Sequence, residues 1–427
     1  MRAMNQNNKK LKAVLVDVID PKTTKEEAQK RLEELESLVQ TFGGIVVLKT
    51  IQQRVVPDYE TYVGKGKLTE IKEYVEEFGA DVVVLNNIIK PRQIYALNEA
   101  FQKMEVKVWD RVDMILKIFS KHAKSTEAKL QIELASIRHM GPRIFGMGIE
   151  LSRQAGAMGV RAGQGESNTE LMKRHLSQQE LNIVKKLEHY DTINKGHRQR
   201  RKRQNYKTAA LVGYTNAGKS SLLNSLTGKK VYIADELFAT LSTRVGKLYI
   251  PSPDFDHAKS QEILIADTIG FIRDLPPGLI KAFKSTLAET VDADLLLHVI
   301  DITDPDIHQK IDIVEEVLEQ LGLSDKPKIY IFNKTDLISP YHFEPREEDL
   351  DEEHKAYLER PGGILPAGEK AAKMLGWHNS DIENRKFMSI KDHPKKLSKK
   401  YKKFNPVFLS AHKKERIEDL IEILKEI

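Results

Sequence analysis

The chain has 427 residues, of which 40% are hydrophobic and 30% are charged, and its formal net charge is +6 at pH 7. This length exceeds one ordinary hydrophobic core and predicts two or three domains. The absence of cysteine excludes disulfides, thiolate metal sites and cysteine nucleophiles, and fits a cytoplasmic protein. The apolar runs are too short to span a bilayer, and the N-terminus lacks the apolar segment of a signal peptide.

Apolar runs alternate with helical patterns from residue 11 to residue 110. The apolar runs predict strands at 11–19, 44–52, 80–87 and 106–110, and the amphipathic patterns predict helices at 25–42, 67–79 and 90–104. Strands separated by helices of this length form largely parallel sheets. We therefore expect a small N-terminal α/β domain over residues 1–110.

The period of the apolar residues changes after residue 110. Leu130, Leu134 and Ile137 fall on one face of a helix, and a second helical pattern runs from about Thr169 to Asn205. Its apolar positions are Leu176, Ile183, Leu187 and Tyr190. Residues 146–168 between the two patterns are rich in Gly and small side chains, which predicts a loop. We expect a long antiparallel helical hairpin over residues 111–205.

Strands and helices alternate again over residues 206–427, which we predict to be a third domain. Residues 213–221, GYTNAGKSS, follow an apolar run and precede a helical pattern, and they have the Gly-x-x-x-x-Gly-Lys-Ser spacing of a phosphate-binding loop. Gly213 and Gly218 let the backbone approach phosphate, Lys219 reaches the outer phosphates, and the Ser220 hydroxyl suits Mg²⁺. The other residues of the predicted cradle are Tyr214, Thr215, Asn216, Ala217 and Ser221.

A second apolar run ends in Asp267, Thr268, Ile269 and Gly270. A strand that ends in Asp supplies the second Mg²⁺ position of phosphate-binding loop enzymes, usually through water, and the Gly270 N–H is free to face a γ-phosphate. Taken alone, the Asp could equally cap a turn.

Two further strand ends complete the pattern. Residues 328–336 end in Asn333, Lys334 and Asp336, and a carboxylate that accepts two N–H donors selects guanine over adenine. Ser410 and Ala411 end another strand, where backbone N–H groups suit the guanine oxygen. Ligands of open α/β sheets lie at the carboxyl ends of strands, and all four motifs fall there in the expected order. The fold class predicted is α/β, with the third domain a P-loop GTPase domain containing a mainly parallel sheet.

The chain resembles the HflX family of ribosome-associated GTPases. Residues 235–244 resemble the family's switch I, where Thr240 would bind Mg²⁺ and sense the γ-phosphate, and residues 267–276 resemble its switch II. Upstream, residues 61–71, 110–135 and 152–166 resemble its N-terminal domain and linker. The resemblance implies binding to the large ribosomal subunit and its rRNA, and the expected catalytic residues are Lys219, Thr240 and Gly270. It also implies GTP as the substrate and Mg²⁺ as the cofactor, with ATP as a second substrate left open. Peripheral contact with a membrane is left open too. We expect a monomer, although the sequence itself carries no signal for the oligomeric state.

The position after Gly270 holds Phe271, where many GTPases carry a water-orienting Gln. We expect slow intrinsic turnover that a partner, most naturally the ribosome, accelerates, although another residue of the chain could orient the water. The resemblance implies a factor that dissociates stalled or idle ribosomes. The alternatives are a ribosome or RNA sensor and an ATP-driven RNA remodeller, in both of which hydrolysis is secondary.

Two basic stretches, residues 194–207 and 391–403, suit the RNA backbone, and either could also be a solvated surface. The second lies at the end of an insertion at about 338–405, dense in Glu, Asp and Lys, to which the sequence assigns no role.

Overall fold

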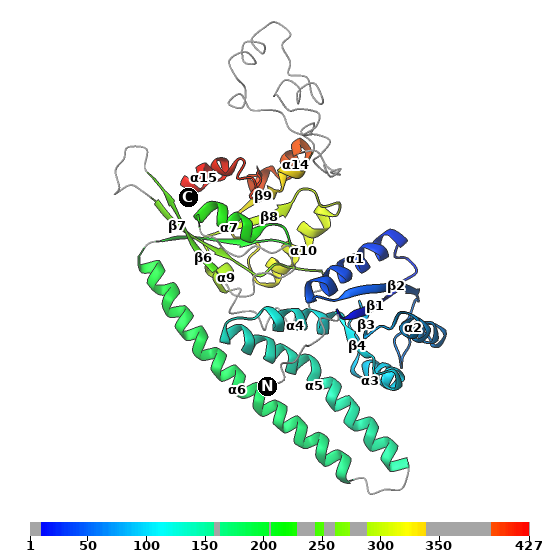
Figure 1. Cartoon of the computed structure of the whole chain (residues 1–427). Coiled ribbons are helices and arrows are strands. Elements are labelled where there is room, and N and C mark those ends of the chain that lie inside the picture. The colour runs from blue at the N-terminus through cyan, green and yellow to red at the C-terminus, as the bar shows by residue number, and fades with distance from the viewer. Residues whose placement is uncertain are drawn as a thin grey trace, which may run out of the picture. The chain divides into compact units, whose positions relative to one another are not determined.

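The computed structural model describes residues 10–157, 163–204, 206–228, 244–251, 261–273, 288–338 and 394–426. These residues fall into two compact units, one that ends at His197 and one that begins at Arg198. Each unit contains one β-sheet, and the long helix α6 continues from the first unit into the second (Figure 1). The prediction that residue 110 separates a domain from the hairpin stays a prediction.

The first unit opens with parallel strands that alternate with helices. The strands are β1 (Lys12–Ile19), β2 (Ile45–Gln53), β3 (Val82–Leu85) and β4 (Lys107–Asp110), and the helices are α1 (Lys25–Phe42), α2 (Lys65–Phe78), α3 (Pro91–Phe101), the 3₁₀ turn η1 (Gln102–Met104) and α4 (Arg111–His122). The sheet has the order β2-β1-β3-β4 with every pair parallel. This confirms the α/β architecture expected from the alternating patterns.

Buried charges in this unit are satisfied by one another. Arg111 is 1% exposed, and its guanidinium donates to Oδ1 of Asn86 and to Oε2 of Glu34, both at 2.8 Å. The Asn86 amide donates in turn to Oδ2 of the fully buried Asp17 at 2.9 Å. A buried charge is tolerated only when it is paired and hydrogen-bonded. The network therefore fixes α1 and α4 against the carboxyl ends of β1 and β3.

Two long helices follow, α5 (Thr126–Ala157) and α6 (Gly163–Arg203). Leu130 and Leu134 of α5 pack with Ile183 of α6 in one apolar cluster. Arg138 pairs with Glu180 at 2.8 Å, whereas Asn194 contacts Glu127, so low numbers on α5 face high numbers on α6. The hairpin is antiparallel, as predicted.

The predicted loop at 146–168 is wrong for most of its length. The structure continues α5 to Ala157 and starts α6 at Gly163, and residues 158–162 lie outside the described residues. Each Gly weakens a helix by about 1 kcal/mol relative to Ala but does not break it. The Met, Leu, Glu, Gln, Arg and Ala residues between the glycines are strong helix formers, which offsets that cost.

The second unit contains a six-stranded, mainly parallel sheet in the order β10-β9-β8-β5-β7-β6. Only β6 runs antiparallel to its neighbour within the described residues. The strands are β5 (Lys207–Val212), β6 (Arg244–Ile250), β7 (Gln261–Asp267), β8 (Leu295–Asp301), β9 (Lys328–Asn333) and β10 (Val407–Phe408). The helices and 3₁₀ turns are α7 (Lys219–Thr227), α9 (Ala288–Asp292), α10 (Ile307–Gln320), η3 (Thr335–Leu337), α14 (Pro394–Lys400), η6 (Lys402–Phe404) and α15 (Ile417–Lys425).

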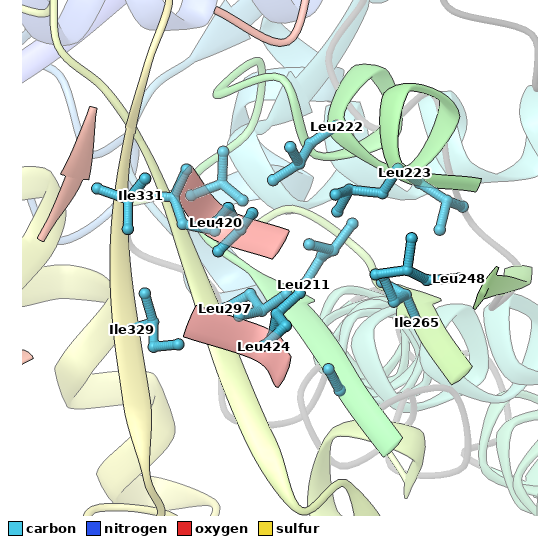
Figure 2. Close-up of a cluster of buried hydrophobic side chains, with 14 of the residues drawn as sticks. Leu211, Leu222, Leu223, Leu248, Ile265, Leu297, Ile329, Ile331, Leu420 and Leu424 are labelled. Carbon is cyan, nitrogen blue, oxygen red and sulfur yellow. The ribbon is translucent and has the colours of Figure 1, made fainter. Parts of the chain in front are cut away.

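Apolar side chains cover both faces of this sheet. On one face, leucines of α7 and α15 pack against Leu211, Leu297 and Ile331 of the central strands (Figure 2). On the other face, Ile307 and Ile311 of α10 pack with Tyr330 and Phe332 of β9. A sheet buried on both faces fixes its strands in register. The carboxyl ends of β5, β7, β8 and β9 therefore lie along one edge.

No helix among the described residues is long and apolar enough to cross a membrane. Of the insertion at about 338–405, the structure describes its first residue, Ile338, and residues 394–405, and the part from 339 to 393 lies outside the described residues.

Candidate nucleotide-binding site

The loop after β5 wraps tightly against the neighbouring strands. A Cβ placed on Gly213 would lie 2.2 Å from the carbonyl oxygen of Val299 on β8. Gly218 has φ +94°, and a Cβ there would lie 2.1 Å from Nδ2 of Asn333. Both contacts are far shorter than any side chain allows, and a positive φ strains every residue except Gly. The two glycines identified in the sequence are therefore required by the backbone itself.

Lys219 begins α7 and points back across the loop that precedes it. Its Nζ donates to the carbonyl oxygens of Tyr214 at 2.7 Å and Gly213 at 3.1 Å. Burial lowers the pKa of the Lys219 ammonium to about 8 from its ordinary value of 10.5, while the nearby Asp267 carboxylate opposes this shift. Two carbonyls and one nearby carboxylate compensate this buried cation only in part, because its pKa is still lowered. The site is thus prepared for an anion.

The hydroxyl of Ser220 and the carboxylate of Asp267 meet at the start of α7. Ser220 Oγ donates to Oδ2 of Asp267 at 2.6 Å, and Asp267 is fully buried. Oxygen groups of this kind are what Mg²⁺ prefers, so the pair fits the ion predicted from the sequence. The adjacent Thr268 donates its hydroxyl to the Leu211 carbonyl at 2.5 Å, which ties the end of β7 to β5. Thr240, the third predicted ligand, lies outside the described residues.

The first residues of switch II form a short parallel bridge with the phosphate-binding loop. Phe271 N donates to the Gly213 carbonyl at 3.1 Å, and Thr215 N donates to the Phe271 carbonyl at 2.8 Å. The Phe271 side chain is 1% exposed. A Cβ on Gly270 would lie 2.9 Å from the Cα of Thr215 and from Nζ of Lys219. The first residues of the predicted switch II therefore lie directly on the loop.

The side chain of Tyr214 reinforces this contact. Its hydroxyl accepts a hydrogen bond from Arg273 N at 2.8 Å, and the Arg273 guanidinium donates to Oε1 of Gln309 on α10 at 2.7 Å. Sequence reasoning placed Tyr214 in the cradle through its backbone and missed its side-chain role, together with Arg273 and Gln309. No local pattern predicts these contacts, because they join segments far apart in the chain.

Asn333 and Asp336 organise the opposite end of the site. The Asn333 amide donates to the Ala217 carbonyl and accepts from Ala411 N, both at 2.9 Å. Ser410 Oγ donates to Oδ1 of the half-buried Asp336 at 2.6 Å. These bonds bring the predicted guanine-binding residues at and after the ends of β9 and β10 next to the phosphate-binding loop.

Lys334 and Asp301 form an ion pair at this end. Lys334 adopts a left-handed conformation with φ +67°, and its Nζ lies 2.7 Å from Oδ2 of Asp301 at the end of β8. The sequence indicated Lys334 but not its partner Asp301.

Three family models match consecutive parts of the chain. They are described as "GTP-binding GTPase N-terminal" for residues 29–120, "GTP-binding GTPase Middle Region" for 122–201 and "50S ribosome-binding GTPase" for 208–334. GTPase HflX of Caldanaerobacter subterraneus subsp. tengcongensis is 44% identical, over 77% of this chain and 73% of that protein. This chain belongs to the HflX family of GTPases. GTPase HflX of Alkalihalophilus pseudofirmus is 41% identical over 74% of this chain and 73% of its own length, and that of Escherichia coli K12 is 40% identical over 80% and 76%.

In this HflX-family protein, Gly218→Ala is expected to weaken GDP binding at least about 100-fold, because the new Cβ must displace Asn333 as well as strain the backbone. Gly228→Ala is the matched control, since Gly228 also has a positive φ but has open space around its Cβ position. Calorimetric titration with GDP measures both affinities. Equal losses in the two variants would contradict the steric argument and leave backbone strain alone as the cause.

GDP binding is expected to take up a proton at Lys219. Phosphate anions stabilise the ammonium form and raise its pKa above the value of about 8 in the free protein. At pH 8 the uptake is about half a proton per site, and GDP affinity falls as the pH rises further. Titration at pH 8 in buffers of different ionisation enthalpy measures the uptake. Lys219→Arg is the control, because a guanidinium keeps its proton throughout this range and its binding is expected to show no uptake from this position.

Proposed function

We propose that this HflX-family GTPase hydrolyses GTP in a cycle that the large ribosomal subunit stimulates, and that it dissociates stalled or idle ribosomes. The observation that carries the proposal is the position of Phe271. The groups for binding GTP converge on one edge of the sheet, yet the residue after Gly270 is a buried Phe without a hydrogen-bonding side chain. A site that has these predicted GTP-binding groups but no water-orienting Gln after Gly270 favours a partner that supplies the missing group.

Guanine selectivity rests on Asp336. A carboxylate accepts the N1 proton and the 2-amino group of guanine, and adenine has neither donor, so adenine leaves the acceptor unpaired. Ser410 orients this carboxylate by donating to one of its oxygens. We infer that GTP is the preferred substrate and that ATP, if it is used, binds more weakly.

Transfer of the γ-phosphoryl group to water requires positioning and charge neutralisation. Mg²⁺, when bound, neutralises charge on the phosphates, with Ser220, Thr240 and Asp267 as the residues that would hold it. Lys219 supplies the second positive charge and is already aimed across the loop by the Gly213 and Tyr214 carbonyls. The N–H of Gly270 is the predicted donor to the γ-phosphate.

In the proposed cycle, the predicted switch II changes its contacts when the partner binds. The Phe271 backbone already bonds to Gly213 and Thr215, and Tyr214 holds Arg273. A bound partner that orders the two switch segments differently supplies the free energy for this change and can place the attacking water. The docked switch II supports slow turnover in the isolated protein.

The ribosome is proposed as that partner on two grounds. The family model that matches residues 208–334 is described as a 50S ribosome-binding GTPase. In addition, α6 ends in a basic segment whose Lys195, Arg200 and Arg203 side chains are exposed, as a contact with the phosphate backbone of rRNA requires. We propose that the protein acts in the cytoplasm as a monomer.

GTP hydrolysis measured with and without purified large ribosomal subunits tests the proposal. We expect stimulation of at least about 10-fold in the wild type and none in Lys219→Ala, because partner-completed GTPase sites gain far more than this. An Arg200→Gln/Arg203→Gln variant is expected to need more subunit for half-maximal stimulation with unchanged basal hydrolysis. Lys185→Gln/Lys186→Gln, exposed in the middle of α6, is the matched control. Subunit binding without any stimulation would contradict the catalytic cycle and favour a ribosome sensor.

A further inference from the structure

Six lysines gather on the short segment that closes the insertion. They belong to α14 and η6, which follow the part of the insertion that lies outside the described residues. We call them the lysine surface: Lys395, Lys396, Lys399 and Lys400 on α14, and Lys402 and Lys403 on η6. All six side chains are exposed.

The arrangement of α14 separates charge from apolar contact. Its four lysines have the spacing i, i+1, i+4 and i+5, which places them within about 140° of the helix circumference. The opposite side carries Pro394 and Leu397, which are buried. An amphipathic helix of this kind directs its whole polar face to solvent.

Aromatic stacking anchors this segment on the second unit. The Phe404 ring stacks on Tyr330 of β9 with centroids 4.2 Å apart and planes 7° apart. The Tyr401 hydroxyl lies 2.7 Å from Nδ1 of His308 on α10, and its ring lies 5.4 Å from that of Tyr330. Stacked aromatic pairs contribute beyond the area that they bury. The lysine surface is therefore held on a rigid base rather than presented on a loop.

The charge of this segment is of one sign. Between Pro394 and Lys414 the sequence contains no Asp or Glu. The other surface helices of this unit are mixed: α10 and α15 both interleave Glu and Asp with Lys. A face that only needs to be solvated carries both signs, since like charges four residues apart on a helix repel. Six exposed lysines in a stretch without Asp or Glu make this surface electrostatically complementary to an anionic ligand.

We propose that the lysine surface binds the phosphate backbone of RNA without sequence preference. Lysine is a compact point charge that contacts phosphates without demanding a fixed geometry. Protein interfaces are depleted in Lys, which disfavours a protein partner. Anionic lipids attract the same charges, but insertion into the membrane interface also uses exposed apolar side chains, and among the described residues none of the exposed large hydrophobic residues lies on α14 or η6.

This site is separate from the nucleotide site and from the basic end of α6. It does not depend on the proposed ribosomal cycle, because any structured RNA supplies the phosphate backbone. It also assigns a role to a part of the insertion, whose sequence alone left a solvated loop and an RNA contact equally open.

A fluorescein-labelled RNA hairpin of mixed sequence, titrated with the full chain at several salt concentrations, tests the proposal. Lys399, Lys400, Lys402 and Lys403 are replaced together by Gln. Each lost phosphate contact lowers the slope of log K against log salt by about 0.7 to 0.9, so the slope is expected to become shallower by about 3. RNA affinity at 0.1 M salt is expected to fall at least about 10-fold.

The matched control replaces four exposed lysines of the first unit, Lys22, Lys25, Lys65 and Lys103, by Gln, with the same change in net charge. It is expected to keep the wild-type slope. A second variant with Arg at the four α14 and η6 positions is expected to retain RNA binding, which separates charge from any effect on folding. Unchanged RNA binding in the Gln variant would overturn the proposal. Binding of the same variant to phosphatidylserine vesicles is measured in parallel, and a loss of vesicle binding with unchanged RNA binding would also overturn it.

Discussion

A buried amide joins the two ends of the candidate nucleotide site. Asn333 donates to the Ala217 carbonyl in the phosphate-binding loop and accepts from Ala411 N in the loop after β10. Both bonds are buried, so each is expensive to leave unmade. Gly218 has no side chain because this amide occupies the space beside it. The loop with the predicted phosphate contacts and the loop with the predicted base contacts are therefore joined by this side chain and by Ser225, whose Oγ donates to the Ala411 carbonyl at 2.6 Å.

The second feature of this site is the contact between the predicted switch II and the phosphate-binding loop. The first residues of switch II add a short parallel bridge to the phosphate-binding loop, fastened by the Tyr214 hydroxyl. Any ligand or partner that moves this segment has to break these hydrogen bonds, and their cost is subtracted from its binding free energy. The proposed dependence of hydrolysis on a partner rests on this arrangement and on the buried Phe271.

Much of this site could be predicted because its residues follow strand ends. Gly213, Lys219, Asp267 and Asn333 each end or follow an apolar run, and parallel topology brings those ends to one edge. The contacts of Tyr214, Arg273 and Asp301 could not be predicted, since they join segments that no local pattern relates. The Gly content of residues 146–157 predicts a loop, whereas the structure is helical there. The residues between the glycines have a high helix propensity, which the Gly content alone does not take into account. The aromatic anchor of α14 depends on packing against β9, which a basic stretch alone does not indicate.

The measurement that tests this account most directly is the GDP affinity of Asn333→Ala. The substitution leaves Ala411 N and the Ala217 carbonyl without their partner while the strand core stays intact. The account predicts a loss of about 10- to 100-fold, the cost of one or two unsatisfied buried groups. It also predicts faster hydrogen exchange at the Ala411 amide in the nucleotide-free protein. Wild-type affinity with unchanged exchange would contradict it and show that the two loops are held independently.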